Sequence, residues 1–350
     1  MLQWSDNRTM NDRAQLDALL QALVAANRPS SMSLSRPDGL RNFTELAQWL
    51  AGPAAGVPGE DLKLDGPAGQ LAVRVYRPAP PAEAHAAEPG PPPGSPAPGP
   101  AQARGAPGSA QALPATMFFH GGGWVLGGLD SHDTLCRELA SQAGVVLIAV
   151  DYRLAPEHPY PAGLDDCVAA TRWVAGHAAE LGVDGSRLAV AGDSAGASLA
   201  ADVALIARDA ADFTVALQVL AYPALDPTMS TASYAANADD PFLSRGEMEY
   251  YWSAYLGDAE ASSTAAAALA QDLTGLPPAY LLVAGRDVLH DEGVAYAGRM
   301  RASGVSVRLR SQAEMVHGFL LCTGWLDTAR ASVTELASFL RAGLGRAGSL

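Results

Sequence analysis

From residue 116 onward, short apolar runs alternate with longer stretches of helical periodicity, and this alternation constrains the fold more than any other feature. Alternating strands and helices favour a parallel sheet with helices on both faces. Strands are predicted at 62–64, 71–76, 116–120, 145–150, 188–191, 217–221, 280–284 and 305–309. Helices are predicted at 131–143, 164–181, 195–210, 292–302 and 326–344. We therefore expect an α/β fold with an eight-stranded, mostly parallel sheet.

The remaining segments flank this sheet. A chain of 350 residues, 49% of them hydrophobic, is long enough for one large α/β domain, predicted to comprise residues 56–225 and 276–350. Residues 226–275 form a long excursion with a helix near 246–256, placed over the carboxyl ends of the strands like a lid. Residues 1–55 are predicted to hold two helices. Their apolar faces are Leu16, Leu19, Leu20 and Leu23, and Phe43, Leu46, Trp49 and Leu50.

Residues 79–114 change abruptly to Pro, Ala and Gly. Such a segment has too little apolar side-chain area to offset the entropy of ordering it, so it is predicted to be a disordered surface loop, partly in the polyproline II conformation. Two interpretations stay open: an inert insertion between strands, and a docking segment for a partner. It is not a domain boundary, because strands that must pair lie on both sides of it.

Charge and cysteine content exclude several classes of function. The net charge of −14, from 37 acidic against 23 basic residues, argues against nucleic acid and gives no attraction to anionic lipid. The three cysteines are too few and too scattered for a disulfide framework or a metal site, and are expected to be buried small side chains. The first ten residues lack the apolar segment of a signal peptide, and no apolar run approaches the ~18 residues that span a membrane. We expect a cytoplasmic protein.

The sequence Gly-Asp-Ser-Ala-Gly at 192–196 follows an apolar strand and opens an Ala-rich helix. This is the context in which G-x-S-x-G forms a nucleophile elbow. The turn is so tight that side chains two places before and after the serine would collide, which explains a glycine at both positions. Such a turn exposes the hydroxyl and places the next N–H at the start of the helix. Ser194 is therefore the candidate nucleophile.

A serine hydroxyl needs a base, and the base needs an acid to orient it. Of seven histidines, His317 follows the last predicted strand, whereas His132 begins a predicted helix, where capping or surface exposure suffices to explain it. Asp287 follows the preceding strand and is the candidate acid. Asp291, four residues later, is a second candidate that fits the first turn of a helix. The order Ser194, Asp287, His317 is that of α/β-hydrolases.

The sequence His-Gly-Gly-Gly-Trp at 120–124 ends another strand and matches the HGGG-type loop that supplies donors to an oxyanion. Consecutive glycines let the backbone approach a substrate closely and turn its N–H groups inward. Gly-rich loops also hold phosphates, but nucleotide motifs come just before a helix with further glycines at defined spacing.

Together these motifs resemble the hormone-sensitive-lipase family of esterases, also called bacterial family IV. The resemblance runs from about residue 71 to the C-terminus. It rests on HGGGW at 120–124, DYRLAPEHPYPAGLDD at 151–166, GDSAG at 192–196, LPPAYLLVAGRDVLHDEG at 276–293 and MVHGF at 315–319. Two features depart from the family pattern: the long loop at 79–114, and Glu314, whose carboxylate either raises the pKa of His317 or points into water.

The resemblance implies an α/β-hydrolase sheet with a helical cap, made from residues 1–55 and 226–275. It also implies hydrolysis of small-molecule carboxylic esters by Ser194, Asp287 and His317, without metal or cofactor. The N–H groups of Gly122, Gly123 and Ala195 would form the oxyanion hole, and His120 would brace its loop. Related enzymes are often homodimers through the edge of the last strand.

The substrate pocket is the least constrained part of the site. The apolar candidates for its lining, each equally plausible as core, are Trp124, Leu126, Tyr222, Phe242, Leu243, Leu289 and Phe319. An enclosing cap favours acyl chains of short to medium length. An amidase or arylformamidase shares the Gly-rich loop and the serine elbow, and a non-catalytic ligand receptor shares the fold but loses a member of the triad. Stereoselectivity is open.

Overall fold

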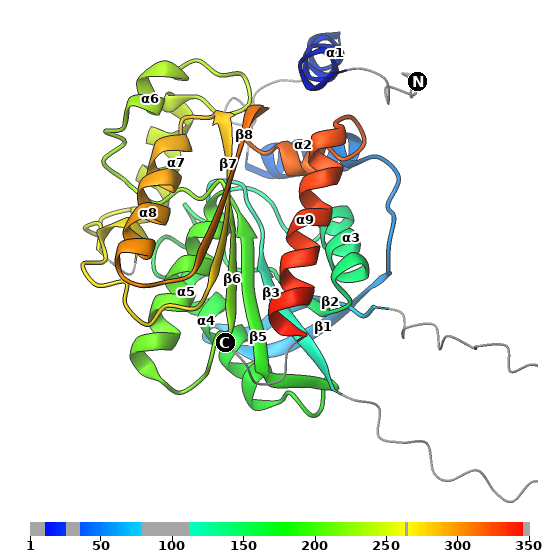
Figure 1. Ribbon diagram of the computed structural model, residues 1–350, viewed down its shortest axis with the longest axis vertical. Coiled ribbons are helices and arrows are strands. Elements are labelled where there is room, and N and C mark those ends of the chain that lie inside the picture. The colour runs from blue at the N-terminus through cyan, green and yellow to red at the C-terminus, as the bar shows by residue number, and fades with distance from the viewer. Residues whose placement is uncertain (1–10, 26–35, 79–111, 263–264, 346–350) are drawn as a thin grey trace, which may run out of the picture.

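The computed structural model describes residues 11–25, 36–78, 112–262 and 265–345, and its described strands form one sheet (Figure 1). The strands are β1 (Gly59–Gly66), β2 (Gly69–Tyr76), β3 (Leu113–Phe119), β4 (Val146–Val150), β5 (Val183–Asp193), β6 (Leu217–Ala221), β7 (Ala279–Arg286) and β8 (Val307–Val316). Their order is β1-β2-β4-β3-β5-β6-β7-β8. Strand β2 lies antiparallel to both neighbours, and the other neighbouring pairs are parallel. The eight-stranded, mostly parallel sheet is confirmed.

Helices cover both faces of the sheet (Figure 1). Two of them, α3 (Asp133–Ala143) and α9 (Asp327–Leu344), pack on one face. The opposite face is covered by α4 (Ala162–Gly176), α5 (Ala195–Ala210) and α8 (His290–Ala302). Two short 3-10 helices, η2 (Ala267–Leu269) and η3 (Phe319–Cys322), lie in connections. Among the described residues, no helix is long and apolar enough to cross a membrane.

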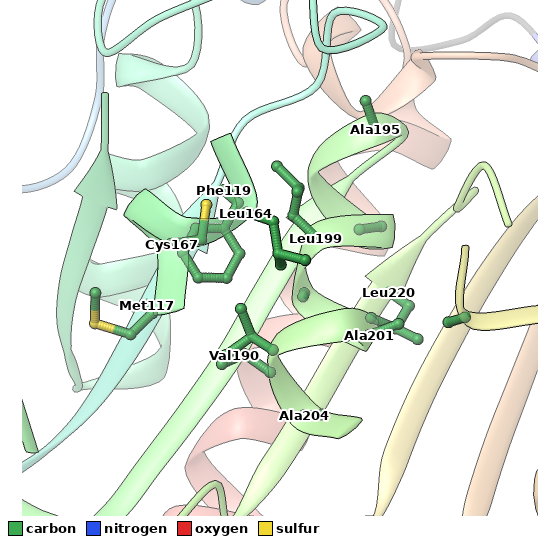
Figure 2. Packing of buried hydrophobic residues seen from close by; sticks show 14 of the residues in the cluster. Met117, Phe119, Leu164, Cys167, Val190, Ala195, Leu199, Ala201, Ala204 and Leu220 are labelled. Atoms are coloured by element: carbon green, nitrogen blue, oxygen red, sulfur yellow. The ribbon is translucent and has the colours of Figure 1, made fainter. Parts of the chain in front are cut away.

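Strand β4 is apolar and buried at every position because both of its faces are covered. In β4, Val146, Ile148 and Val150 face one core cluster, whereas Leu147 and Ala149 face the other. Figure 2 shows α5 lying over β5 and β6, with small and branched side chains packed between helix and sheet. All three cysteines are buried and unpaired in this core, as expected. A fully packed sheet holds its strand ends rigidly, and these ends therefore fix the positions of the loops that follow them.

Several predicted boundaries were wrong; for example, α4 ends at Gly176 instead of 181, and β1 covers Gly59–Gly66 instead of 62–64. Strand β8 runs to Val316 instead of ending at 309, and β5 begins at Val183 instead of 188. Both additional stretches are largely polar or exposed, so no apolar run marks them. Strand β3 begins at Leu113, which places the last two residues of the predicted 79–114 loop in the sheet. Residues 79–111 lie outside the described residues, and the prediction of disorder there stays a prediction.

Two further groups of helices lie near the carboxyl ends of the strands. Helix α1 (Asp12–Ala25) packs against the start of α9, where Gln15 accepts from the Asp327 N–H at 2.9 Å and donates to its carboxylate at 2.7 Å. Helix α2 (Arg36–Ala51) contacts η3. Between β6 and β7 the chain forms α6 (Ala232–Ala236) and α7 (Arg245–Leu256), the second begun by a capping box of Ser244 and Glu247.

Candidate active site

The turn between β5 and α5 has the geometry of a nucleophile elbow. Ser194 has φ 54° and ψ −125°, a strained conformation for a residue with a side chain. Its N–H donates to Ala221 O at 2.8 Å. A Cβ on Gly192 would lie 2.4 Å from the backbone of Gly196, and a Cβ on Gly196 would lie 2.0 Å from Phe119 O. Only glycine fits at either position, as the spacing of the motif predicts.

Three side chains from neighbouring strand ends form a continuous hydrogen-bonded chain. His317 Nε2 lies 2.9 Å from Ser194 Oγ, and His317 Nδ1 lies 2.7 Å from Asp287 Oδ2. Each residue directly follows its strand, and the carboxyl ends of parallel strands meet at one edge of a sheet. The other oxygen of Asp287 accepts from the Leu289 N–H at 2.9 Å. The structure thus brings Ser194, His317 and Asp287 together, in the geometry of a serine nucleophile with its base and acid.

Asp291, the alternative acid, lies in the first turn of α8 and does not contact His317. Its carboxylate accepts from the Ser233 N–H at 2.9 Å and pairs with His290. Glu314 is exposed to solvent. The carboxylates that act electrostatically on His317 are those of Asp287, Asp193 and Asp240. Of the two alternatives for Glu314, the structure favours the second: its side chain points into water and does not act on the pKa of His317.

The Gly-rich loop after β3 lies directly against the elbow. Gly122 and Gly123 have φ of 121° and 62°, which favour glycine. A Cβ on Gly123 would lie 2.3 Å from the ring of Tyr251, so no larger residue fits. Ala195 begins α5, and its N–H is one of the first-turn groups that have no partner within a helix. The loop and the helix N-terminus thus meet beside Ser194.

Two histidines lie under this loop. His120 Nδ1 contacts Gly121 O at 2.8 Å, and its ring stacks on Tyr152. Burial lowers the pKa of His120 to about 3, so it stays neutral and suits a bracing role. The expectation that His132 caps a helix or lies on the surface was wrong. It is 1% exposed, makes no capping bond, and pairs with Asp193 at 3.1 Å. The sequence at the start of a helix does not show which distant residues will pack against it in the folded protein.

An apolar cavity opens beside Ser194 and His317, with a volume of about 700 Å³ including its open mouth. Helix α2, the segment before α7, α7 itself and η3 supply its apolar side chains. These are Phe43, Leu46, Leu50, Phe242, Leu243, Met248, Tyr251, Leu321 and Cys322.

Most of the predicted pocket residues lie elsewhere. Phe242 and Leu243 line the cavity, but Trp124, Leu126, Tyr222, Leu289 and Phe319 do not. Trp124, at φ 59°, stacks on Tyr255, with ring centroids 4.4 Å apart. Tyr222 packs edge-on against the His317 ring, with ring centroids 4.9 Å apart. Proximity in the chain to a catalytic motif was a poor guide, because strained turns direct these side chains into the core.

The residues that sequence reasoning missed come from helices distant in sequence. The apolar stripe Phe43, Leu46 and Leu50 was visible, but its period does not reveal whether it faces core or cavity. Met248 and Tyr251 lie three residues apart on α7. This spacing also indicates one face of a helix without showing whether that face meets the core or the cavity. The part of the chain that the structure describes contains no group of three or more His, Cys, Asp or Glu that could hold a metal ion.

Comparisons with known proteins agree with this geometry. A family model described as the alpha/beta hydrolase fold matches residues 116–321. The carboxylesterase NlhH of Mycobacterium tuberculosis is 46% identical over 213 residues, which are 59% of this chain and 67% of that protein. The ethyl acetate hydrolase of Pseudomonas putida is 35% identical over 342 residues, covering 95% of this chain and 99% of that one.

Solved structures extend the likeness to almost the whole chain. An alpha/beta hydrolase enzyme from the metagenome of Lake Arreo, Spain, superposes with a TM-score of 0.83 at 34% identity, covering 96% of this chain and 99% of that one. The hyperthermophilic esterase from the archaeon Pyrobaculum calidifontis superposes with a TM-score of 0.81 at 33% identity, covering 93% and 97%. This chain therefore belongs to the alpha/beta hydrolase family, among the carboxylic ester hydrolases that resemble hormone-sensitive lipase.

Proposed function

We propose that this protein is a carboxylesterase that hydrolyses esters of short- to medium-chain acids through Ser194, His317 and Asp287. The hydrogen-bonded chain Asp287–His317–Ser194, at the wall of an apolar cavity, carries this proposal. The names of the relatives support the same reaction class.

The proposed reaction is acyl transfer in two halves. His317 takes the proton of Ser194 as Ser194 Oγ attacks the ester carbonyl, and Asp287 holds the imidazole in the tautomer that can accept that proton. The N–H groups of Gly122, Gly123 and Ala195 would donate to the oxyanion. His317 then protonates the leaving alcohol as the C–O bond breaks. Water repeats the sequence on the acyl-enzyme, releases the acid and restores Ser194.

We further propose that residues 1–55 and 226–275 together form the cap of the site. Helices α2 and α7 both contribute apolar side chains to the cavity, which supports this assignment. A cavity enclosed in this way would exclude long acyl chains. A small-molecule substrate, a cytoplasmic location and a possible homodimer through the edge of β8 also remain predictions.

Acyl-chain preference should depend on α2. Replacing Phe43 with Ala removes a ring from the cavity wall and is expected to raise the ratio of kcat/KM for p-nitrophenyl octanoate to that for the butyrate about tenfold. Rates across esters from acetate to palmitate test this, with the wild type expected to prefer chains of up to about eight carbons. Glu45→Ala, on the exposed side of the same helix, is the control and should leave the ratio unchanged. An unchanged ratio in Phe43→Ala would place the acyl chain elsewhere.

Activity should fall at low pH with a midpoint above 6.5. Burial alone would lower the pKa of His317, but the nearby carboxylates, Asp287 first among them, outweigh it and raise that pKa above its ordinary 6.5. Because only neutral His317 can take a proton, activity is complete above its pKa and is lost as the pH falls through it. The profile of kcat/KM from pH 5 to 9 gives the midpoint. A midpoint at or below 6.5 would argue against this account.

A substitution of Asp240 tests whether nearby negative charges set the pH midpoint of activity. Asp240→Asn removes a negative charge that acts on His317 and should move the midpoint to lower pH. Its neighbour Asp239 is exposed and is not among the charges acting on His317, so Asp239→Asn is the matched control and should leave the midpoint unchanged.

A further inference from the structure

A buried carboxylate lies between the two halves of the proposed oxyanion hole. Asp193 directly precedes Ser194 and Ala195, and its side chain is 4% exposed. Its Oδ1 accepts from the Gly121 N–H at 2.9 Å, and Gly121 directly precedes the other two donors. A Cβ on Gly121 would lie 2.6 Å from Asp193 Oδ2. The Asp193 carboxylate thus joins the elbow to the Gly-rich loop. The N–H groups of both must point at the oxyanion of the substrate.

His132 holds the same oxygen of this carboxylate that the Gly121 N–H contacts. The Nε2 of His132 lies 3.1 Å from Asp193 Oδ1 and 3.3 Å from Gly121 N. Because an ionised carboxylate only accepts, Nε2 carries the hydrogen of the bond to Asp193, and the Gly121 N–H is donated to Asp193 Oδ1 at the shorter distance of 2.9 Å. The Nδ1 of His132 contacts Ser131 Oγ at 2.8 Å. That hydroxyl also lies 2.9 Å from Gly128 O and accepts from the Gly128 N–H at 3.1 Å. The imidazole is therefore fixed on both edges.

The charge of Asp193 makes this contact important for the reaction. Burial alone would raise the pKa of Asp193, but His132 and the hydrogen bond from Gly121 outweigh it and hold the pKa below its ordinary value, so Asp193 is an anion. A buried carboxylate without a partner beside the oxyanion hole would repel the negative charge that develops there and would lose its fixed orientation.

We propose that His132 is a positioning residue of the active site, which fixes the Asp193 carboxylate and through it the Gly121–Gly123 loop relative to Ser194. This rests on the proposed esterase function and extends it to a residue that never meets the substrate. Misplacing the loop by a fraction of an ångström weakens donors that act mainly in the transition state, so the effect falls on kcat.

Two variants of His132 differ by a single methylene and separate positioning from packing. The amide nitrogen of Gln reaches the place of the histidine Nε2, so His132→Gln keeps the donor to Asp193 and should retain kcat within about fivefold. Asn reaches only the place of Nδ1, so His132→Asn should lose about 100-fold in kcat with KM within about threefold. Affinity for a trifluoromethyl ketone, which mimics the oxyanion, should fall in parallel with kcat/KM. Equal kcat in both variants, or a lower Tm in His132→Asn with wild-type kcat, would overturn the proposal.

A double-mutant cycle tests whether His132 acts through Asp193. Asp193→Asn removes the charge and keeps an oxygen for the Gly121 N–H. In that background, His132→Asn and His132→Gln should differ by less than about threefold, because no carboxylate remains to be held. An undiminished difference would contradict the proposed route. His177→Gln, at the distant end of α4, is the control and should keep wild-type kinetics. Full activity of Ser194→Ala would refute the esterase mechanism itself, a separate failure from equal kcat in the two His132 variants.

Discussion

Replacing Asp287 with Asn is expected to lower kcat for an ester substrate by about 10⁴-fold, with little change in KM. Asp287 Oδ2 accepts the Nδ1 hydrogen of His317 at 2.7 Å, which leaves Nε2 free of hydrogen and able to take the proton of Ser194. An Asn amide can donate to Nδ1 and so favours the opposite tautomer, with its hydrogen directed at Ser194. Steady-state kinetics with p-nitrophenyl butyrate measure the loss.

Asp291→Asn is the matched control, because Asp291 lies four residues away and contacts Ser233 and His290 instead of His317. It should keep kcat within about threefold and lose at most about 1 kcal/mol of stability as a charge leaves the helix N-terminus. A large loss of kcat in Asp291→Asn, with an active Asp287→Asn, would reverse the assignment of the acid.

Gly196→Ala should abolish most activity and destabilise the fold. The added Cβ would lie 2.0 Å from Phe119 O and 2.5 Å from His120 O, and both are backbone atoms of a central strand end that have no room to move. We expect a loss of about 3 kcal/mol in the free energy of unfolding and at least about 100-fold in kcat, because the elbow and the oxyanion loop are forced apart. Denaturant unfolding and steady-state kinetics measure the two effects.

Gly298→Ala provides the comparison. Gly298 lies on the exposed side of α8, and a Cβ there would meet no atom within 4 Å apart from its chain neighbours and the backbone of its own helix. This substitution should stabilise the protein by about 0.5–1 kcal/mol, because alanine is the better helix former, and should leave kcat unchanged. Wild-type stability in Gly196→Ala would mean that the elbow is looser than its geometry indicates.

The sheet was predictable because buried strands must be apolar on both faces, as in β4 and residues 188–191 of β5. The same reasoning failed at β8, an edge strand whose residues 310–314 are polar or exposed. The residues of the triad were predictable because each directly follows a strand in a parallel sheet, where chain order and strand order together fix proximity. Their hydrogen bonds required the structure.

The cavity and the contact between His132 and Asp193 under the loop were not predictable. Phe43 and Tyr251 approach the site from helices outside the repeating pattern of strand and helix, and a single helical stripe does not specify what it faces. The role of His132 was not predictable for the same reason. Its partner Asp193, the residue before the nucleophile, lies 61 residues away in the sequence. Pairwise contacts between loops depend on the packed sheet that positions them, and no local pattern encodes them.

The most direct measurement of the central claim is the turnover of p-nitrophenyl butyrate by Ser194→Ala. The variant removes one oxygen from a residue that is 7% exposed and leaves the backbone of the elbow in place. With a circular dichroism spectrum and Tm like those of the wild type, its kcat should fall by about 10⁶-fold, to the rate that the remaining site supports. Turnover that equals the wild type would show that Ser194 is not the nucleophile.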